Sequence, residues 1–158
     1  NVKLNTMINL GPFSGSNCPN VRFRPVLIDR ILEGVAILLF LTTCGCILWL
    51  HTRGGELPIP NVWIAGGVAF LCLILMGVCS YLPVRFYNFP VRVNERNIGI
   101  QYLLAVRLTR VMNVILNLMF LSGAFLEYYG PAKVFFFGSF GLLALALLGY
   151  YILAFRCK

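Results

Sequence analysis

Ionisable residues are scarce in this chain, and their scarcity restricts the chemistry that it can carry. Only 11% of the residues are charged, and His51 is the only histidine. One histidine cannot supply both axial ligands of a bis-histidine membrane haem, and no His-x-x-Glu-His type of zinc motif is present. The sequence also lacks a Ser/His/Asp or Cys/His set in a plausible register, a glycine-rich phosphate loop and paired carboxylates within its apolar segments. We therefore expect a protein that is not an enzyme and that holds no cofactor and no metal ion.

Apolar residues are abundant instead, and they are arranged in four long runs. Hydrophobic residues make up 59% of the chain and the mean hydropathy is +0.85, both outside the usual range of a soluble domain. The runs cover roughly residues 31–50, 62–82, 111–126 and 134–155, and most approach the ~20 residues of a membrane-spanning helix. This pattern predicts an all-α integral membrane protein, a four-helix bundle.

One transmembrane domain is expected over residues 26–158, after a flexible cytoplasmic arm of residues 1–25. Its helices are predicted at about 31–50, 62–82, 95–128 and 134–155. The third helix is expected to start before its apolar run, because Asn94-Glu95-Arg96-Asn97 offers an N-cap and an acidic first turn. It would then carry an extension of several turns outside the membrane.

The basic residues are distributed unevenly between the runs. Of the 13 Lys and Arg residues, eleven lie before the first run, between the second and third, or after the fourth. By the positive-inside rule, both termini and the central connection are predicted to be cytoplasmic. No single basic face carries stacking aromatics, so we expect no nucleic-acid partner, and anionic lipid headgroups are the expected counter-charge.

A polar stripe crosses the third apolar run. Arg107, Arg110, Asn113 and Asn117 are spaced by three, three and four residues, which places them on one helix face. The stripe could line a path for a ligand, a lipid headgroup or an ion. Alternatively, the arginines reach lipid phosphates while the asparagines hydrogen-bond to a neighbouring helix. We favour these helix–helix or lipid contacts, because no acidic residue joins the stripe in the sequence.

Two further groups of polar residues lie near predicted membrane boundaries. Arg30 and Glu33 are three residues apart at the start of the first helix and are expected to pair at the interface. A proton-carrying role for Glu33 is the alternative, although carriers usually lie deeper in the membrane. The central connection supplies a candidate surface for a cytoplasmic partner, formed by Arg92, Arg96, Asn97, Gln101 and Tyr102.

Several short motifs occur around the first three predicted helices. They are Asp29-Arg30-Ile31-Leu32-Glu33, Leu57-Pro58, Asn88-Phe89-Pro90-Val91, Asn97, Gln101-Tyr102 and Arg107. In these motifs the chain, from about Val26 to Tyr128, resembles a bacterial family of small multi-pass membrane proteins of unassigned function, related to the N-terminal domain of SdpI-type immunity proteins. The Pro-x-His-Phe-Asn motif that this family usually carries after its first helix is absent here. The resemblance implies a multi-pass protein of the bacterial cytoplasmic (inner) membrane and no particular chemistry.

Three functions are compatible with these features. The leading hypothesis is a non-catalytic accessory or structural subunit of a bacterial membrane assembly, in contact with other membrane-protein subunits or with a second copy of itself. The resemblance suggests the alternative of a stand-alone toxin-immunity or signalling protein in the membrane. A lipid-binding membrane protein is the third. Transport is less favoured, because the chain shows neither an inverted repeat nor a broken helix.

Overall fold

The computed structural model describes residues 25–52, 59–94, 96–126 and 129–157, and within them the chain is helical with no strand. The elements are α1 (Leu27–Thr52), α2 (Ile59–Cys79), the short 3-10 helix η2 (Val84–Phe86), α3 (Ile98–Ala124) and α4 (Ala132–Arg156). The predicted all-α class with four helices is confirmed. Apart from Pro25, the predicted flexible arm lies outside the described residues.

Length and composition allow α1, α3 and α4 to cross a membrane, and the apolar part of α2 described here, Trp63–Cys79, is shorter. The first helix begins at Leu27, four residues before its predicted start. Asp29 explains the difference, because its carboxylate Oδ2 accepts a 2.9 Å hydrogen bond from the Val26 backbone N–H, as in a capping box. Asp29 therefore belongs to the first turn of α1, where its charge also favours the helix N-terminus.

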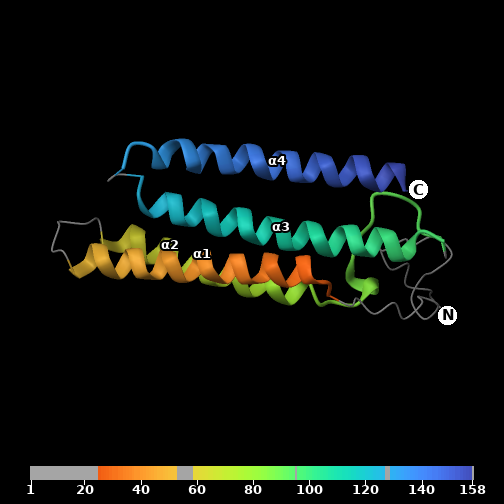
Figure 1. Cartoon of the computed structure of the whole chain (residues 1–158), viewed down its shortest axis with the longest axis horizontal. Helices are drawn as coiled ribbons and strands as arrows, with labels where there is room; N and C mark the ends of the chain where they lie inside the picture. The colour runs from red at the N-terminus through yellow and green to blue at the C-terminus, as the bar shows by residue number, and fades with distance from the viewer. Residues whose placement is uncertain (1–24, 53–58, 95, 127–128, 158) are drawn as a thin grey trace, which may run out of the picture.

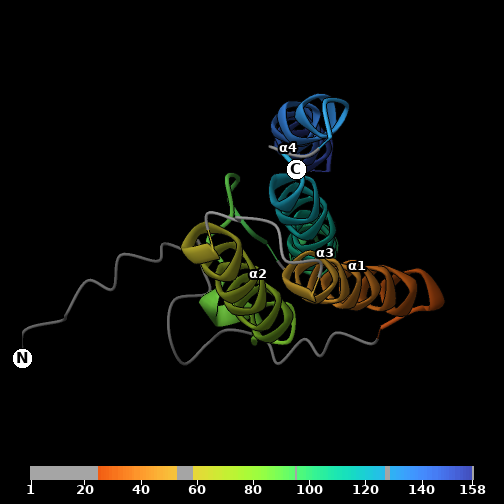
Figure 2. The ribbon, with the colours of Figure 1, turned by 90° about the vertical axis from the view of Figure 1, so that its left-hand side faces the viewer.

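Helix α3 is the centre of the molecule. Helices α1 and α2 pack against each other and against one side of α3, and α4 packs against α3 from the opposite side. Figure 2 shows α4 apart from α1 and α2 when the helices are viewed end-on. The bundle is therefore open, and only Ala132, Ser139 and Ala154 of α4 are buried.

The Ile47 side chain of α1 packs closely over Gly66 of α2. A Cβ atom at Gly66 of α2 would lie only 2.9 Å from Ile47 Cδ1 of α1. Ala36 of α1 and Ala69 of α2 are also buried. Small residues at a helix interface increase the contact between the helices, which is the main source of attraction when the surroundings are themselves apolar.

The amino end of α3 extends beyond α1 and α2 and is covered by the connection that follows α2 (Figure 1). Val84, Val93, Ile98, Tyr102 and Val106 form a small core there, with Tyr87 and Phe89 packed against it. The Tyr102 hydroxyl also donates a 2.8 Å hydrogen bond to the Leu82 carbonyl. This core fixes the connection that follows α2 against the amino end of α3.

Candidate functional site

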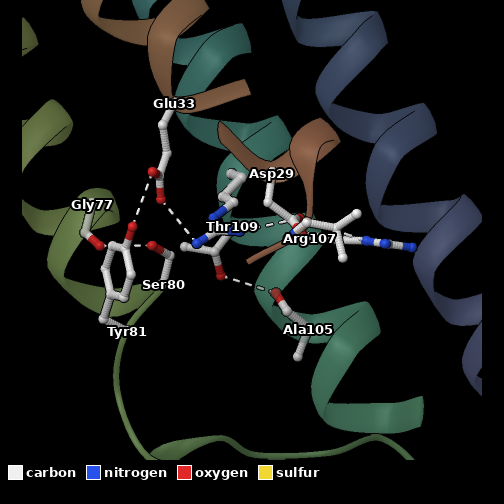
Figure 3. Close-up of polar contacts among 10 residues, drawn as sticks. Asp29, Glu33, Gly77, Ser80, Tyr81, Ala105, Arg107 and Thr109 are labelled. Atoms are coloured by element: carbon white, nitrogen blue, oxygen red, sulfur yellow. Dashed lines mark hydrogen bonds and ion pairs between the residues drawn. The ribbon is translucent and has the colours of Figure 1, made fainter. Parts of the chain in front are cut away.

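Charged side chains from α1 and α3 meet near the amino end of α1 (Figure 3). Arg110 Nη1 lies 3.1 Å from Asp29 Oδ1, and Arg110 Nη2 lies 2.9 Å from Glu33 Oε1. Arg107 Nε lies 3.6 Å from the same Asp29 oxygen. We call Asp29, Glu33, Tyr81, Arg107 and Arg110 the ion-pair cluster.

Helical spacing brings these residues together. Asp29 and Glu33 are four residues apart on α1, and Arg107 and Arg110 are three apart on α3, so each pair shares one face of its helix. The side chain of Arg110 is only 2% exposed and that of Asp29 is 0% exposed. Removing a charge from water is costly unless an opposite charge compensates it. Two carboxylates facing two guanidinium groups provide that compensation, and their formal charges cancel.

Tyr81 joins the end of α2 to the cluster. Its hydroxyl donates a 2.9 Å hydrogen bond to Glu33 Oε2, and the Arg110 guanidinium lies 5.4 Å from the centre of its ring. The hydrogen bond to Glu33 is the main cause that raises the pKa of Tyr81, and burial adds to it. The cluster thus links α1, α3 and the residues that follow α2.

The sequence interpretation of the polar stripe requires two corrections. Acidic residues do join it, because Asp29 and Glu33 reach it from α1, and Arg110 is buried in an ion pair instead of extending to lipid phosphates. Glu33 binds Arg110 and Tyr81 and not Arg30, which is exposed. Arg30 follows Asp29 directly in the helix and is therefore turned about 100° away from the face that meets α3.

Asn113 and Asn117 continue the stripe into α3, and both are buried. The Asn117 amide donates to the Asn113 carbonyl at 2.9 Å and to Asn113 Oδ1 at 3.0 Å. These hydrogen bonds stay within α3 and do not reach a neighbouring helix, contrary to the expectation. Asn117 Oδ1 is buried and accepts no hydrogen bond from the described part of the chain.

The five residues of the predicted partner surface differ in their exposure to solvent. Arg92 and Arg96 are exposed, whereas Asn97, Gln101 and Tyr102 are buried. Asn97 Oδ1 accepts a 2.6 Å hydrogen bond from the Asn94 backbone, and its amide donates to the Arg92 carbonyl. These three buried side chains have structural roles, so only the two arginines remain available to a partner.

Gln101 connects α3 to the last turn of α4. Its amide Nε2 donates to the Ala154 carbonyl at 2.9 Å and to the Cys157 carbonyl at 3.3 Å. The last carbonyls of a helix have no partner within that helix, so a side-chain donor from α3 satisfies two acceptors that would otherwise need water. Sequence reasoning missed this contact, because nothing in the spacing of Gln101 shows that a helix end lies beside it.

The described residues form no metal centre, and no relative indicates a chemical function for the cluster. Among the described residues, no group of three or more His, Cys, Asp or Glu side chains could hold a metal ion. Comparison with protein families, with curated proteins and with solved structures finds no match to this chain. The resemblance inferred from short motifs therefore stays a prediction. The fold and the site define an all-α protein with three helices long and apolar enough to span a membrane, in which an ion-pair cluster joins the first turns of α1 to the middle of α3.

Proposed function

We propose that this chain is a non-catalytic, multi-pass membrane protein that acts as a structural or accessory subunit of a membrane assembly. The observation that carries the proposal is the open packing of α4, which meets α3 on one side and leaves most of its apolar surface without a protein neighbour. Val134, Phe137 and Leu145 are each at least 65% exposed. In a membrane, such a surface is available to the helices of other subunits.

The charged residues support a structural role over a catalytic one. Arg110 and Asp29, the most buried ionised groups of the cluster, contact each other and thereby hold α1 against α3. A group that binds a substrate or carries protons needs access to it, whereas these two groups are enclosed. The cluster is therefore suited to fixing the α1–α3 unit as a rigid platform.

Orientation in the membrane is part of the proposal. The amino ends of α1 and α3 and the carboxyl ends of α2 and α4 lie at the same end of the molecule (Figure 1). Exposed arginines gather at this end: Arg30, Arg85, Arg92, Arg96 and Arg156. The positive-inside rule then assigns this end, with both termini, to the cytoplasm. The bacterial inner membrane follows from the motif resemblance alone.

A subunit should be recovered with its companions. We expect the chain, extracted from native membranes in a mild detergent, to migrate on native gels with other proteins in fixed proportion. Gly138 and Gly141 are exposed on α4, and a Cβ atom at either position would meet no other atom within 4 Å. Gly138→Leu with Gly141→Leu should release the companions without unfolding the chain, because helices pack closely over small residues.

Gly34→Leu on α1 is the matched control, since a Cβ atom there also has open space. It should leave the assembly intact. Recovery of the wild-type chain alone would contradict the subunit role and favour the stand-alone immunity or signalling alternative.

A further inference from the structure

An open, apolar cavity of about 340 Å³ lies between α1, α3 and α4, towards the carboxyl end of α3. We call this cavity, together with the face of α3 that leads from it to Arg107, the α1–α4 groove. The lining includes Thr42 and Cys46 of α1, Leu118 and Leu121 of α3, and Ala132 and Phe135 of α4.

Arg107 of the ion-pair cluster lies on the same face of α3 as this cavity. Spacings of four, three and four residues lead from Arg107 through Val111 and Val114 to Leu118, so the four side chains form one row. Val111, Val114 and Leu118 are only partly buried. An apolar strip therefore connects a positive charge to the apolar cavity.

The Arg107 guanidinium keeps capacity for a second anion. Its side chain is 40% exposed, and its contact with Asp29 is the long one, at 3.6 Å from Nε, whereas Arg110 approaches the same carboxylate to 3.1 Å. Figure 3 shows Arg107 on the side of the cluster nearer α4, away from Glu33 and Tyr81. A guanidinium group has five N–H donors, and phosphate oxygens match its geometry.

The length of the strip fits one lipid leaflet. A rise of 1.5 Å per residue places Leu118 about 16 Å from Arg107 along α3. One leaflet is about half of a hydrocarbon core that is ~30 Å thick. An acyl chain whose phosphate is held at Arg107 would therefore reach the cavity at Leu118.

We propose that the α1–α4 groove binds one anionic phospholipid, with its phosphate on Arg107 and one acyl chain running along α3 to Leu118. The formal net charge of +8 and the exposed arginines at this end of the molecule favour an anionic headgroup over a zwitterionic one. The inference rests on the membrane location proposed above and is independent of the subunit role.

Binding of defined lipids to the purified full chain tests the proposal. Phosphatidylglycerol and phosphatidylcholine are added separately to delipidated protein in mild detergent, and the bound lipid is counted by native mass spectrometry. We expect one tightly retained phosphatidylglycerol molecule and weaker retention of phosphatidylcholine. Arg107→Gln should weaken phosphatidylglycerol binding about tenfold, the loss expected for a charge-assisted hydrogen bond. Arg92→Gln, which removes an exposed arginine outside the groove, should leave it unchanged.

A second pair of variants tests the acyl chain and remains informative if Arg107→Gln fails to fold. Leu118→Trp narrows the entrance to the cavity and should weaken binding, whereas Leu148→Trp on the exposed surface of α4 should not. Arg107→Lys keeps the positive charge and should keep the preference for phosphatidylglycerol.

Equal binding by Arg107→Gln and Arg92→Gln, equal binding by the two tryptophan variants, or equal affinity for the two lipids would overturn the lipid site. Release of the chain from membranes by alkaline carbonate would instead contradict the membrane location itself. Failure of the lipid site and failure of the proposed function are therefore distinguishable.

Discussion

Arg110 and Asp29 lie 3.1 Å apart, and neither side chain is more than 2% exposed. The two residues are far apart in the sequence, one in the first turn of α1 and the other in the middle of α3. Their contact fixes the axial register of α1 relative to α3. Each charge compensates the other, so the packing of α1 against α3 depends on both residues being charged.

Removing the Arg110 charge is expected to destabilise the fold strongly. Arg110→Met leaves Asp29 with the longer Arg107 contact as its ion pair and Glu33 with its hydrogen bond from Tyr81. An uncompensated buried charge costs about 3–5 kcal/mol. Thermal unfolding in detergent should therefore show a much lower midpoint than that of the wild type. Arg92→Met removes an exposed arginine and should change the midpoint little. Equal midpoints for the two variants would contradict a structural role for the cluster.

Gln101→Leu should loosen the carboxyl end of α4. The substitution removes the donor to the Ala154 and Cys157 carbonyls, a loss of about 1 kcal/mol per hydrogen bond. We expect Cys157 to react with a maleimide up to about thirtyfold faster, as measured by peptide mass analysis after timed labelling. Arg96→Leu, at an exposed position before α3, serves as the control. Unchanged labelling of the Gln101 variant would show that the contact does not hold α4 in place.

Replacing the buried asparagines is expected to affect stability much less than replacing Arg110. Their hydrogen bonds stay within α3, so replacing Asn113 and Asn117 together with leucine should change the free energy of unfolding by about 1 kcal/mol or less. Unfolding by a titrated denaturing detergent measures this change. A loss of several kcal/mol would restore the idea that the asparagines join neighbouring helices.

We expect the ionisation of Tyr87 to lower the free energy of unfolding at high pH. Burial is the main cause that raises the pKa of Tyr87 from 10.0 to about 12. The folded state therefore favours the neutral phenol. The stability contributed by Tyr87 is complete below about pH 10 and is lost as the pH rises to about 12, because the unfolded state releases the proton first.

The phenolate absorbance of the wild type minus that of Tyr87→Phe isolates this ionisation. A difference spectrum that titrates near pH 10 would contradict the burial of Tyr87. The Tyr87→Phe variant should also lose the part of the pH-dependent destabilisation that Tyr87 contributes.

Hydropathy predicted the four helices because most of the apolar runs approach the length of a membrane-spanning helix. The bounds of α1 were less predictable, since Asp29 and Arg30 are polar and were placed before the helix. The carboxylate of Asp29 caps the helix start and lies against α3, so both its backbone role and its partner stabilise the extra turn.

The ion-pair cluster could not be derived from spacing alone. The sequence shows that Arg107 and Arg110 share a face, and that Asp29 and Glu33 share another, but not that these two faces meet. The available signal was a pair of acidic residues at helical spacing near the start of one apolar run. A pair of basic residues at helical spacing near the start of another run completed it. The packing position of α4 could not be predicted from the sequence either. A helix that is apolar on all sides has no polar face to indicate which side contacts its neighbour.

A double-mutant cycle between Asp29 and Arg110 tests most directly whether the buried charges hold the helices together. Asp29→Asn, Arg110→Gln and the double variant are compared with the wild type by thermal unfolding in the same detergent. We expect the double variant to be more stable than the sum of the single losses implies, with a coupling of about 1–3 kcal/mol. Losses that simply add would show that the two side chains do not stabilise each other and that the buried charges do not hold α1 against α3.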